Sequence, residues 1–261
     1  MNRQHLSPAE SILLGALGLA AFLGIWSALS LTGVVPHQFL PAPHEVAARV
    51  LDLMTTPFAG ATLGEHLASS ALRFAYGFLL GAVIGVPLGL LMGWFRVLDE
   101  IVSPMFDALR FIAPIAWVPF AALWFGTGIG GPILIIFAGA FPPCLINTYR
   151  GARHVSRPLI EAAQMLGTGH LRIIVEVLLP ASTASIVAGL RVAAGLGWQS
   201  LIGAELIVAS TGVGFMMVQA QLNISTTTVM SAMVAIGIVG LLIDVALRGL
   251  EAAVRRRGLV A

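Results

Sequence analysis

The segment FAYGFLLGAVIGVPLGLLMGW, residues 74–94, decides the fold class because it contains no charged side chain. A helix crosses the hydrocarbon core of a bilayer with about 20 apolar residues, at a rise of roughly 1.5 Å each. Backbone groups in lipid must be paired within a helix or a closed barrel, and barrel strands are much shorter than this segment. Residues 74–94 therefore predict a membrane-spanning helix.

Glycines recur at every fourth position of this segment. They are Gly77, Gly81, Gly85, Gly89 and Gly93. This spacing places them on one stripe of the helix, where another helix can approach closely. We therefore expect a helix packed against the stripe, and passage of a substrate along it is the alternative. Pro87 lies in the same segment and removes one backbone hydrogen bond, which bends a helix.

Apolar windows of spanning length recur along the chain. They are Ser11–Leu31, Phe74–Trp94, Ala108–Phe125, Pro132–Tyr149, Ile186–Val208 and Val229–Leu247. Only 10% of the residues are charged, against about a quarter in soluble domains. The sequence thus predicts an all-α integral membrane protein with six transmembrane helices in a single domain, residues 1–261. The first window is expected to stay in the mature protein, since a signal peptide has a shorter apolar region.

All 14 basic residues are arginines, and most of them fall on one side of the predicted membrane. That side holds Arg3, Arg96, Arg150, Arg153, Arg157, Arg172, Arg248, Arg255, Arg256 and Arg257, and the other side holds Arg49 and Arg73. Positively charged loops stay in the cytoplasm, so both termini are predicted to be cytoplasmic. The outer side then carries a long loop, 32–70, with a short helix over 45–54. The largest inner loop is 150–183.

Composition and spacing disfavour several other functions. The net charge of +2, without a basic run, argues against nucleic acid as a partner. Cys144 is the only cysteine, and the six histidines include no His-x-x-x-His spacing, so no metal site is expected. An enzyme of the membrane interface would need clustered Asp or His, and the acidic residues are scattered. A secondary carrier, the other alternative, would need paired broken helices or an acidic relay.

The inner loop contains the signals of two short helices. Pro158 fits the first turn of one helix, and Gly167 can end it in a left-handed conformation. The apolar side chains of this helix share one face: Leu159, Ala163 and Leu166. A second short helix is expected over His170–Leu178, ended by Pro180. We interpret the pair as a docking platform on the cytoplasmic face.

These residues resemble the cytoplasmic loop of permease subunits of binding-protein-dependent ABC importers. That family shares the pattern Glu-Ala-Ala, three residues, Gly, nine residues, then Ile-x-Leu-Pro. Here Glu161-Ala162-Ala163 is followed at the same spacing by Gly167 and by Val177-Leu178-Leu179-Pro180. The only departure is valine for isoleucine at Val177, a loss of one methylene.

The resemblance implies that the loop inserts into a groove on an ATPase subunit, whose closure is transmitted as rocking of two permeases. It assigns this coupling role to Glu161, Ala162, Ala163, Gly167 and Pro180. It also implies two ATPase subunits that carry ATP and Mg, an external solute-binding protein, and a second permease copy, as a homodimer in the bacterial inner membrane. The chain has no lysine and hence no P-loop, so we expect it to be no enzyme and to bind no cofactor.

Further stretches resemble the branch of this family that imports sulfonates, taurine, nitrate and related oxyanions. They are 66–70, 116–119, 123–128 and 203–206. The implied function is translocation of a small oxyanion, such as taurine, an alkanesulfonate or nitrate, from periplasm to cytoplasm. Other members of the branch carry thiamine precursors or aromatic acids, so the solute stays open.

Charged residues within the spans predict ion pairs, because isolated charges are costly in a membrane. Two local helix pairs are expected, Asp107 with Arg110 and Asp244 with Arg248. Arg73 shares the depth of Glu205 and is its expected partner. For Arg191 our hypothesis is an interhelical pair with Asp107.

Five residues are candidates for the translocation path or its gate. They are Trp117, Arg191, Trp198, Gln199 and Glu205. For the two tryptophans, packing within the membrane domain is the alternative. For Glu205, a structural ion pair is the alternative, since a bare carboxylate would repel an anionic substrate.

Overall fold

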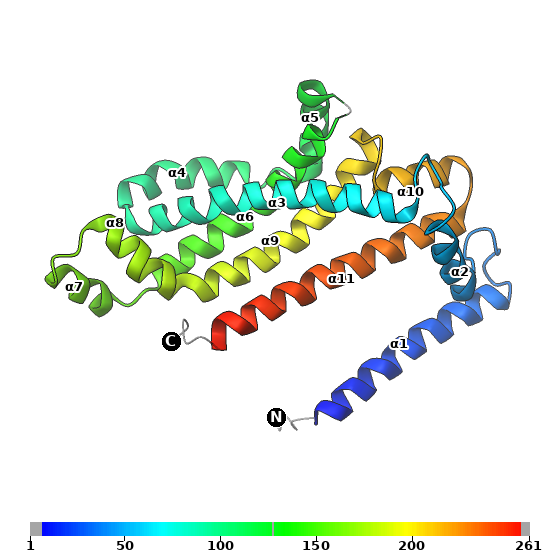
Figure 1. Cartoon of the computed structure of the whole chain (residues 1–261), viewed down its shortest axis with the longest axis horizontal. Helices are drawn as coiled ribbons and strands as arrows, with labels where there is room; N and C mark the ends of the chain where they lie inside the picture. Colours follow the sequence, from blue (N-terminus) through cyan, green and yellow to red (C-terminus); the bar gives the residue numbers. More distant parts are fainter. Residues whose placement is uncertain (1–6, 127, 257–261) are drawn as a thin grey trace. The chain divides into compact units, whose positions relative to one another are not determined.

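The computed structural model describes residues 7–126 and 128–256, and all regular elements within these ranges are helices (Figure 1). Within these ranges, five helices are long and apolar enough to cross a membrane, and a sixth span results if one bent pair of helices counts as a single span. The predicted all-α membrane fold is therefore confirmed. The described residues form two compact units, one of 7–63 with 216–235 and one of 64–215 with 236–256.

The first unit contains α1 (Pro8–Leu31), α2 (Pro43–Leu53) and the beginning of α11 (Thr226–Arg256). The indole Nε1 of Trp26 donates a hydrogen bond to the carbonyl oxygen of Pro41 (3.0 Å), which holds the end of α1 beside the start of α2. Ser231 Oγ donates to the carbonyl oxygen of Val46 (3.2 Å) and ties α11 to α2. The short helix expected in the first loop is thus present as α2.

The second unit contains most of the remaining helices. They are α3 (Leu63–Trp94), α4 (Arg96–Leu109), η1 (Pro114–Trp117), α5 (Val118–Phe125), α6 (Gly130–Arg153), α7 (Arg157–Met165), α8 (His170–Ile173), η2 (Ile174–Leu178), α9 (Leu179–Val208) and the first residues of α10 (Val213–Leu222). The later part of α11 also belongs to this unit.

The glycine stripe of α3 packs against α6. A Cβ added at Gly77 would lie 2.6 Å from Cβ of Ile136, and one added at Gly85 would lie 2.9 Å from Cβ of Cys144. Contacts this short leave no room for a side chain, so the glycines allow the two backbones to approach. Residue numbers rise together along both helices, so α3 and α6 run parallel. The predicted close packing is confirmed.

Helix α6 is the centre of the second unit, because α9 packs against another of its faces. A Cβ added at Gly189 would lie 2.6 Å from Cβ of Asn147, and Gly139 faces Ser200 without space for a side chain. Rising numbers on α6 match falling numbers on α9, so these two helices are antiparallel. Figure 1 shows them side by side.

The predicted third span, 108–125, is not one continuous helix. Helix α4 ends at Leu109, and the segment from η1 to α5 points in a direction 86° away. A residue before proline is forced out of the helical region, and Ala113, which precedes Pro114, has ψ 138°. Pro119 occupies the first turn of α5, where no N–H is needed.

The predicted inner loop, 150–183, is mostly helical. Its first short helix is present as α7, and its second as α8 followed by η2, a π-helical segment. The prediction that Pro180 ends this second helix is wrong, because the helical path continues from His170 to Val208. The N–H of Leu179 bonds to the carbonyl oxygen of Ile174, five residues back. This wider turn accommodates the ring of Pro180 and its missing N–H.

Candidate functional site

Helix α7 carries three of the residues with the predicted coupling role, Glu161, Ala162 and Ala163, and Gly167 follows its end. Pro158 lies in its first turn, as expected. Gly167 has φ +74°, and its N–H bonds to the carbonyl oxygen of Gln164 (2.9 Å) while the N–H of Thr168 reaches Ala163 (3.2 Å). The left-handed helix end predicted at Gly167 is therefore confirmed. Glycine suits this conformation because it has no Cβ to clash.

The outward surface of α7 and of the residue that follows it exposes large apolar side chains. Glu161 and Ala162 are exposed, and Ala163 is half-buried. Met165 and Leu166 expose 87% and 85% of their surface. The helix contacts its own unit through Ile160, which packs on the cluster that includes Leu90 and Ala152. Pro180 lies apart from α7, half-buried within the path from α8 to α9.

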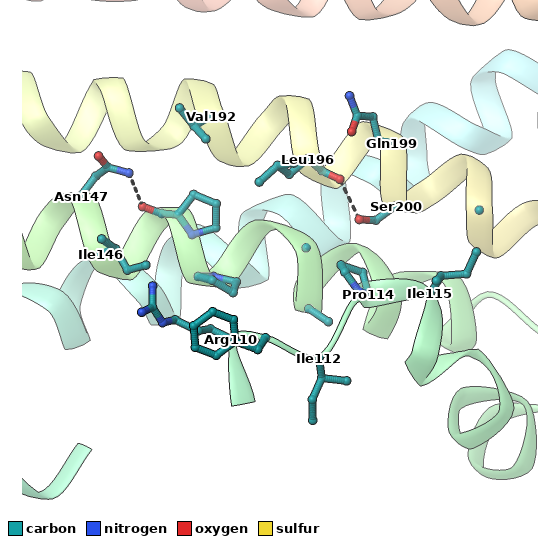
Figure 2. Close-up of a pocket in the computed structure, with 16 residues that line it drawn as sticks. Arg110, Ile112, Pro114, Ile115, Ile146, Asn147, Val192, Leu196, Gln199 and Ser200 are labelled. Carbon is teal, nitrogen blue, oxygen red and sulfur yellow. Dashed lines mark hydrogen bonds between the residues drawn. The ribbon is translucent and has the colours of Figure 1, made fainter. Parts of the chain in front are cut away.

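A groove of about 550 Å³ runs between α6, α9 and the segment 110–115 (Figure 2). Most of its lining is apolar, and its polar side chains are Arg110, Asn147, Gln199 and Ser200. Asn147 Nδ2 donates to the carbonyl oxygen of Pro143 (2.9 Å), and Ser200 Oγ donates to that of Leu196 (2.7 Å).

Among the described residues, the side-chain oxygen of Asn147 accepts no hydrogen bond. Gln199 is exposed, and among the described residues no hydrogen-bond partner reaches its amide. The polar lining thus consists of two side-chain amides, the hydroxyl of Ser200 and the charged Arg110. Of the five residues predicted for the path, Gln199 alone lines this groove.

The two tryptophans of the prediction belong to packed clusters. Trp198 is buried, meets the ring of Phe74 edge-on at 5.5 Å and donates from Nε1 to the carbonyl oxygen of Ile236 (3.3 Å). Trp117 is half-buried beside Val118. These positions match the packing alternative for both side chains.

Glu205 and Arg73 form the predicted ion pair, with 2.8 Å between Glu205 Oε1 and the guanidinium. Both side chains are buried. Ser70 Oγ donates to the same carboxylate at 2.8 Å, and the N–H of Gly214 donates at 3.0 Å. Arg73 also donates to the carbonyl oxygen of Thr211 (2.7 Å). The network holds the turn between α9 and α10 against α3.

Sequence reasoning did not find the smaller members of this network. Gly212 has φ +110° and sits against the Glu205 carboxylate with no space for a side chain, and its N–H donates to His66 Nδ1 (3.1 Å). The one available signal was the Ser-Thr-Gly-Val-Gly run at 210–214 directly after a span. Such a run is typical of a tight turn.

The hypothesis that Arg191 pairs with Asp107 is wrong. Arg191 Nε lies 2.7 Å from Asp244 Oδ1 on α11, and its NH1 lies 3.6 Å from Glu251. Asp107 instead pairs locally with Arg110 at 2.9 Å, as the spacing along the helix predicted. The depth of Arg191 in the membrane did not reveal which helix its side chain faces. The structure shows that this helix is α11.

Comparison with known proteins agrees with this architecture. The family model described as "Binding-protein-dependent transport system inner membrane component" matches residues 85–258. A putative ABC transporter permease protein of Methanocaldococcus jannaschii is 40% identical over 77% of this chain and 78% of its own. The taurine transport system permease protein of Escherichia coli is 32% identical over 95% and 90%, and the bicarbonate transport system permease protein of Synechococcus elongatus is 35% identical over 90% and 86%.

The fold has a solved counterpart in the MetNI methionine ABC transporter. One chain of its inward-facing form superposes with a TM-score of 0.64 at 23% identity, covering 74% of this chain and 95% of that one. The helical architecture and these matches define a multi-pass helical permease of the inner membrane. The chain belongs to the family of binding-protein-dependent transport system inner membrane components, the permeases of ABC transporters.

Proposed function

We propose that this chain is the permease subunit of an ATP-driven importer that moves a small oxyanion from periplasm to cytoplasm. Taurine, alkanesulfonates and nitrate are the proposed solutes. Support comes from relatives whose names give taurine and bicarbonate as their solutes, both small molecules with an anionic oxygen group. The imported molecule would undergo no covalent change on this chain.

The observation that carries the proposal is the surface of α7. Met165 and Leu166 lie exposed beside Glu161 and Ala162 on a short helix with a well-formed left-handed end. Apolar side chains exposed next to small ones favour a protein partner that packs closely. In the proposed complex this partner is the ATPase subunit, which carries ATP and Mg, and Gly167 fixes the angle at which α7 is presented.

The proposed complex contains two copies of this chain, two ATPase subunits and a solute-binding protein. Both termini and α7 face the cytoplasm, in line with the arginine distribution. The groove beside α6 and α9 forms one wall of the path, and Gln199 and Asn147 offer amide groups to a passing anion. Neutral amides can pair with an oxyanion without holding it as tightly as a charge would.

The test is ATP-driven uptake into proteoliposomes that contain this chain, its ATPase and its binding protein. Ala162→Trp places a bulky ring on the exposed face of α7 and should abolish uptake and ATPase retention. Ala252→Trp is the matched control, since Ala252 is an exposed alanine on α11. Uptake without ATP, or uptake unchanged by Ala162→Trp, would contradict the importer assignment.

The solute is decided in the same assay with labelled taurine, an alkanesulfonate, nitrate and bicarbonate. Competition by one of these anions supports the oxyanion assignment. Uptake of a thiamine precursor or an aromatic acid in their place would retain the importer and reject the oxyanion.

A further inference from the structure

A second hollow, of about 510 Å³, lies where the end of α3, the start of α4 and the helices α7 and α8 meet. Its lining includes Trp94, Arg96, Arg157, Glu161 and His170. It lies at the opposite end of α3 from the Arg73–Glu205 pair. We propose that this hollow binds the phosphate headgroup of an anionic membrane phospholipid.

The charges of the hollow favour an anion. Arg157 is exposed and has no ion-pair partner among the described residues. Arg96 donates from Nε to Glu100 at 2.9 Å, which leaves its two terminal nitrogens free to bind phosphate oxygens. Arg96 and Arg157 give the lining two positive charges, and Glu161 gives it one negative charge. Guanidinium groups can bind phosphate oxygens through two parallel N–H bonds.

The position of the hollow favours a lipid over a soluble anion. Trp94 is the last residue of the α3 span, and tryptophan is enriched where a span meets the headgroup layer. The exposed apolar stripe of α4 begins directly after Arg96 and consists of Val97, Ile101 and Met105, which expose 72%, 60% and 64% of their surface. A phospholipid with its phosphate on Arg96 can lay its acyl chains along this stripe. A soluble phosphate has no acyl chains that could contact this stripe.

An anionic phospholipid also fits the cytoplasmic side of the membrane, where the arginine distribution predicts that this hollow lies. Anionic lipids create a negative surface that attracts basic residues close to the spans. The hollow shares α7 with the proposed coupling surface, but its binding of lipid does not depend on transport. Lipid binding and uptake can therefore fail separately.

The test measures phosphatidylglycerol retained by the purified full chain, by native mass spectrometry after exchange from phosphatidylcholine nanodiscs. Removing each arginine, as Arg96→Gln or Arg157→Gln, should weaken retention about fivefold, since each near-surface basic residue contributes about 1 kcal/mol. Arg172→Gln is the matched control, because Arg172 forms the same helical pair with Glu176 (2.8 Å) outside the hollow. It should leave retention within about twofold of the unchanged protein.

Three results would overturn the proposal. Equal losses for Arg172→Gln and Arg96→Gln would reveal only a general surface charge. Inorganic phosphate that displaces the lipid completely would make the occupant a soluble anion. Lipid retention that Ile101→Ser leaves unchanged would show that the acyl chains do not lie along α4. Lower retention of the lipid, with unchanged affinity for inorganic phosphate, supports a lipid whose acyl chains contact this stripe.

Discussion

Removing the charge of Arg73 should be among the most damaging single changes in the second unit. In Arg73→Met, the Glu205 carboxylate keeps its bonds from Ser70 and Gly214 but loses its positive partner while it stays buried. An uncompensated buried charge costs about 3–5 kcal/mol. That loss is a large part of a typical unfolding free energy of about 5–15 kcal/mol.

The double variant separates the charge from the packing. Glu205→Gln combined with Arg73→Met removes both charges and should recover about 1–3 kcal/mol relative to the sum of the two single changes. The free energy of unfolding is measured for all four proteins by titration with sodium dodecyl sulfate in bicelles. Strictly additive losses would refute the reasoning, because they would mean that the two charges do not interact in the folded chain.

Three further predictions concern other contacts. Gly85→Leu should lower the free energy of unfolding by about 1–3 kcal/mol through overpacking of α3 on α6, whereas Gly237→Leu, where an added Cβ has no neighbour within 4 Å, should not. Arg191→Asp should be rescued by Asp244→Arg, which restores the pair in reverse, and absence of rescue in the same unfolding assay would contradict the contact. The backbone N–H of Ala42 donates to Glu45 Oε2 (3.0 Å) at the start of α2 and lowers the pKa of that carboxyl group. The contact therefore stabilises α2 fully above the ordinary glutamate pKa, and this stabilisation is lost as pH falls through the lowered value. Glu45→Gln should remove this pH dependence from the hydrogen-exchange protection of α2.

Local patterns in the sequence were sufficient for most of the helices and for part of the candidate site. The span over 74–94 and the left-handed end at Gly167 depend on residues within one or two turns, so spacing alone predicts them. The Arg73–Glu205 pair was also predictable, because both charges lie at the same end of long spans and have few other partners. The coupling role of α7 stays a prediction from family resemblance.

The break between Leu109 and Pro114 was harder to predict. Apolar residues run almost continuously through this region, and hydropathy responds to composition rather than to backbone direction. The same limit applies at Pro180, where a π-helical turn preserves a helix that a proline normally ends.

By itself, the sequence determined that this chain is a helical membrane protein, which stripe of α3 packs against a neighbour, and which loop resembles the coupling loop of ABC importers. Only the tertiary structure decided that α3 and α9 both pack on α6, that Arg191 meets Asp244, and that Gln199 lines the groove while Trp198 does not. The physical reason is that composition and periodicity are properties of one helix. Which helices become neighbours depends on how all their surfaces pack together.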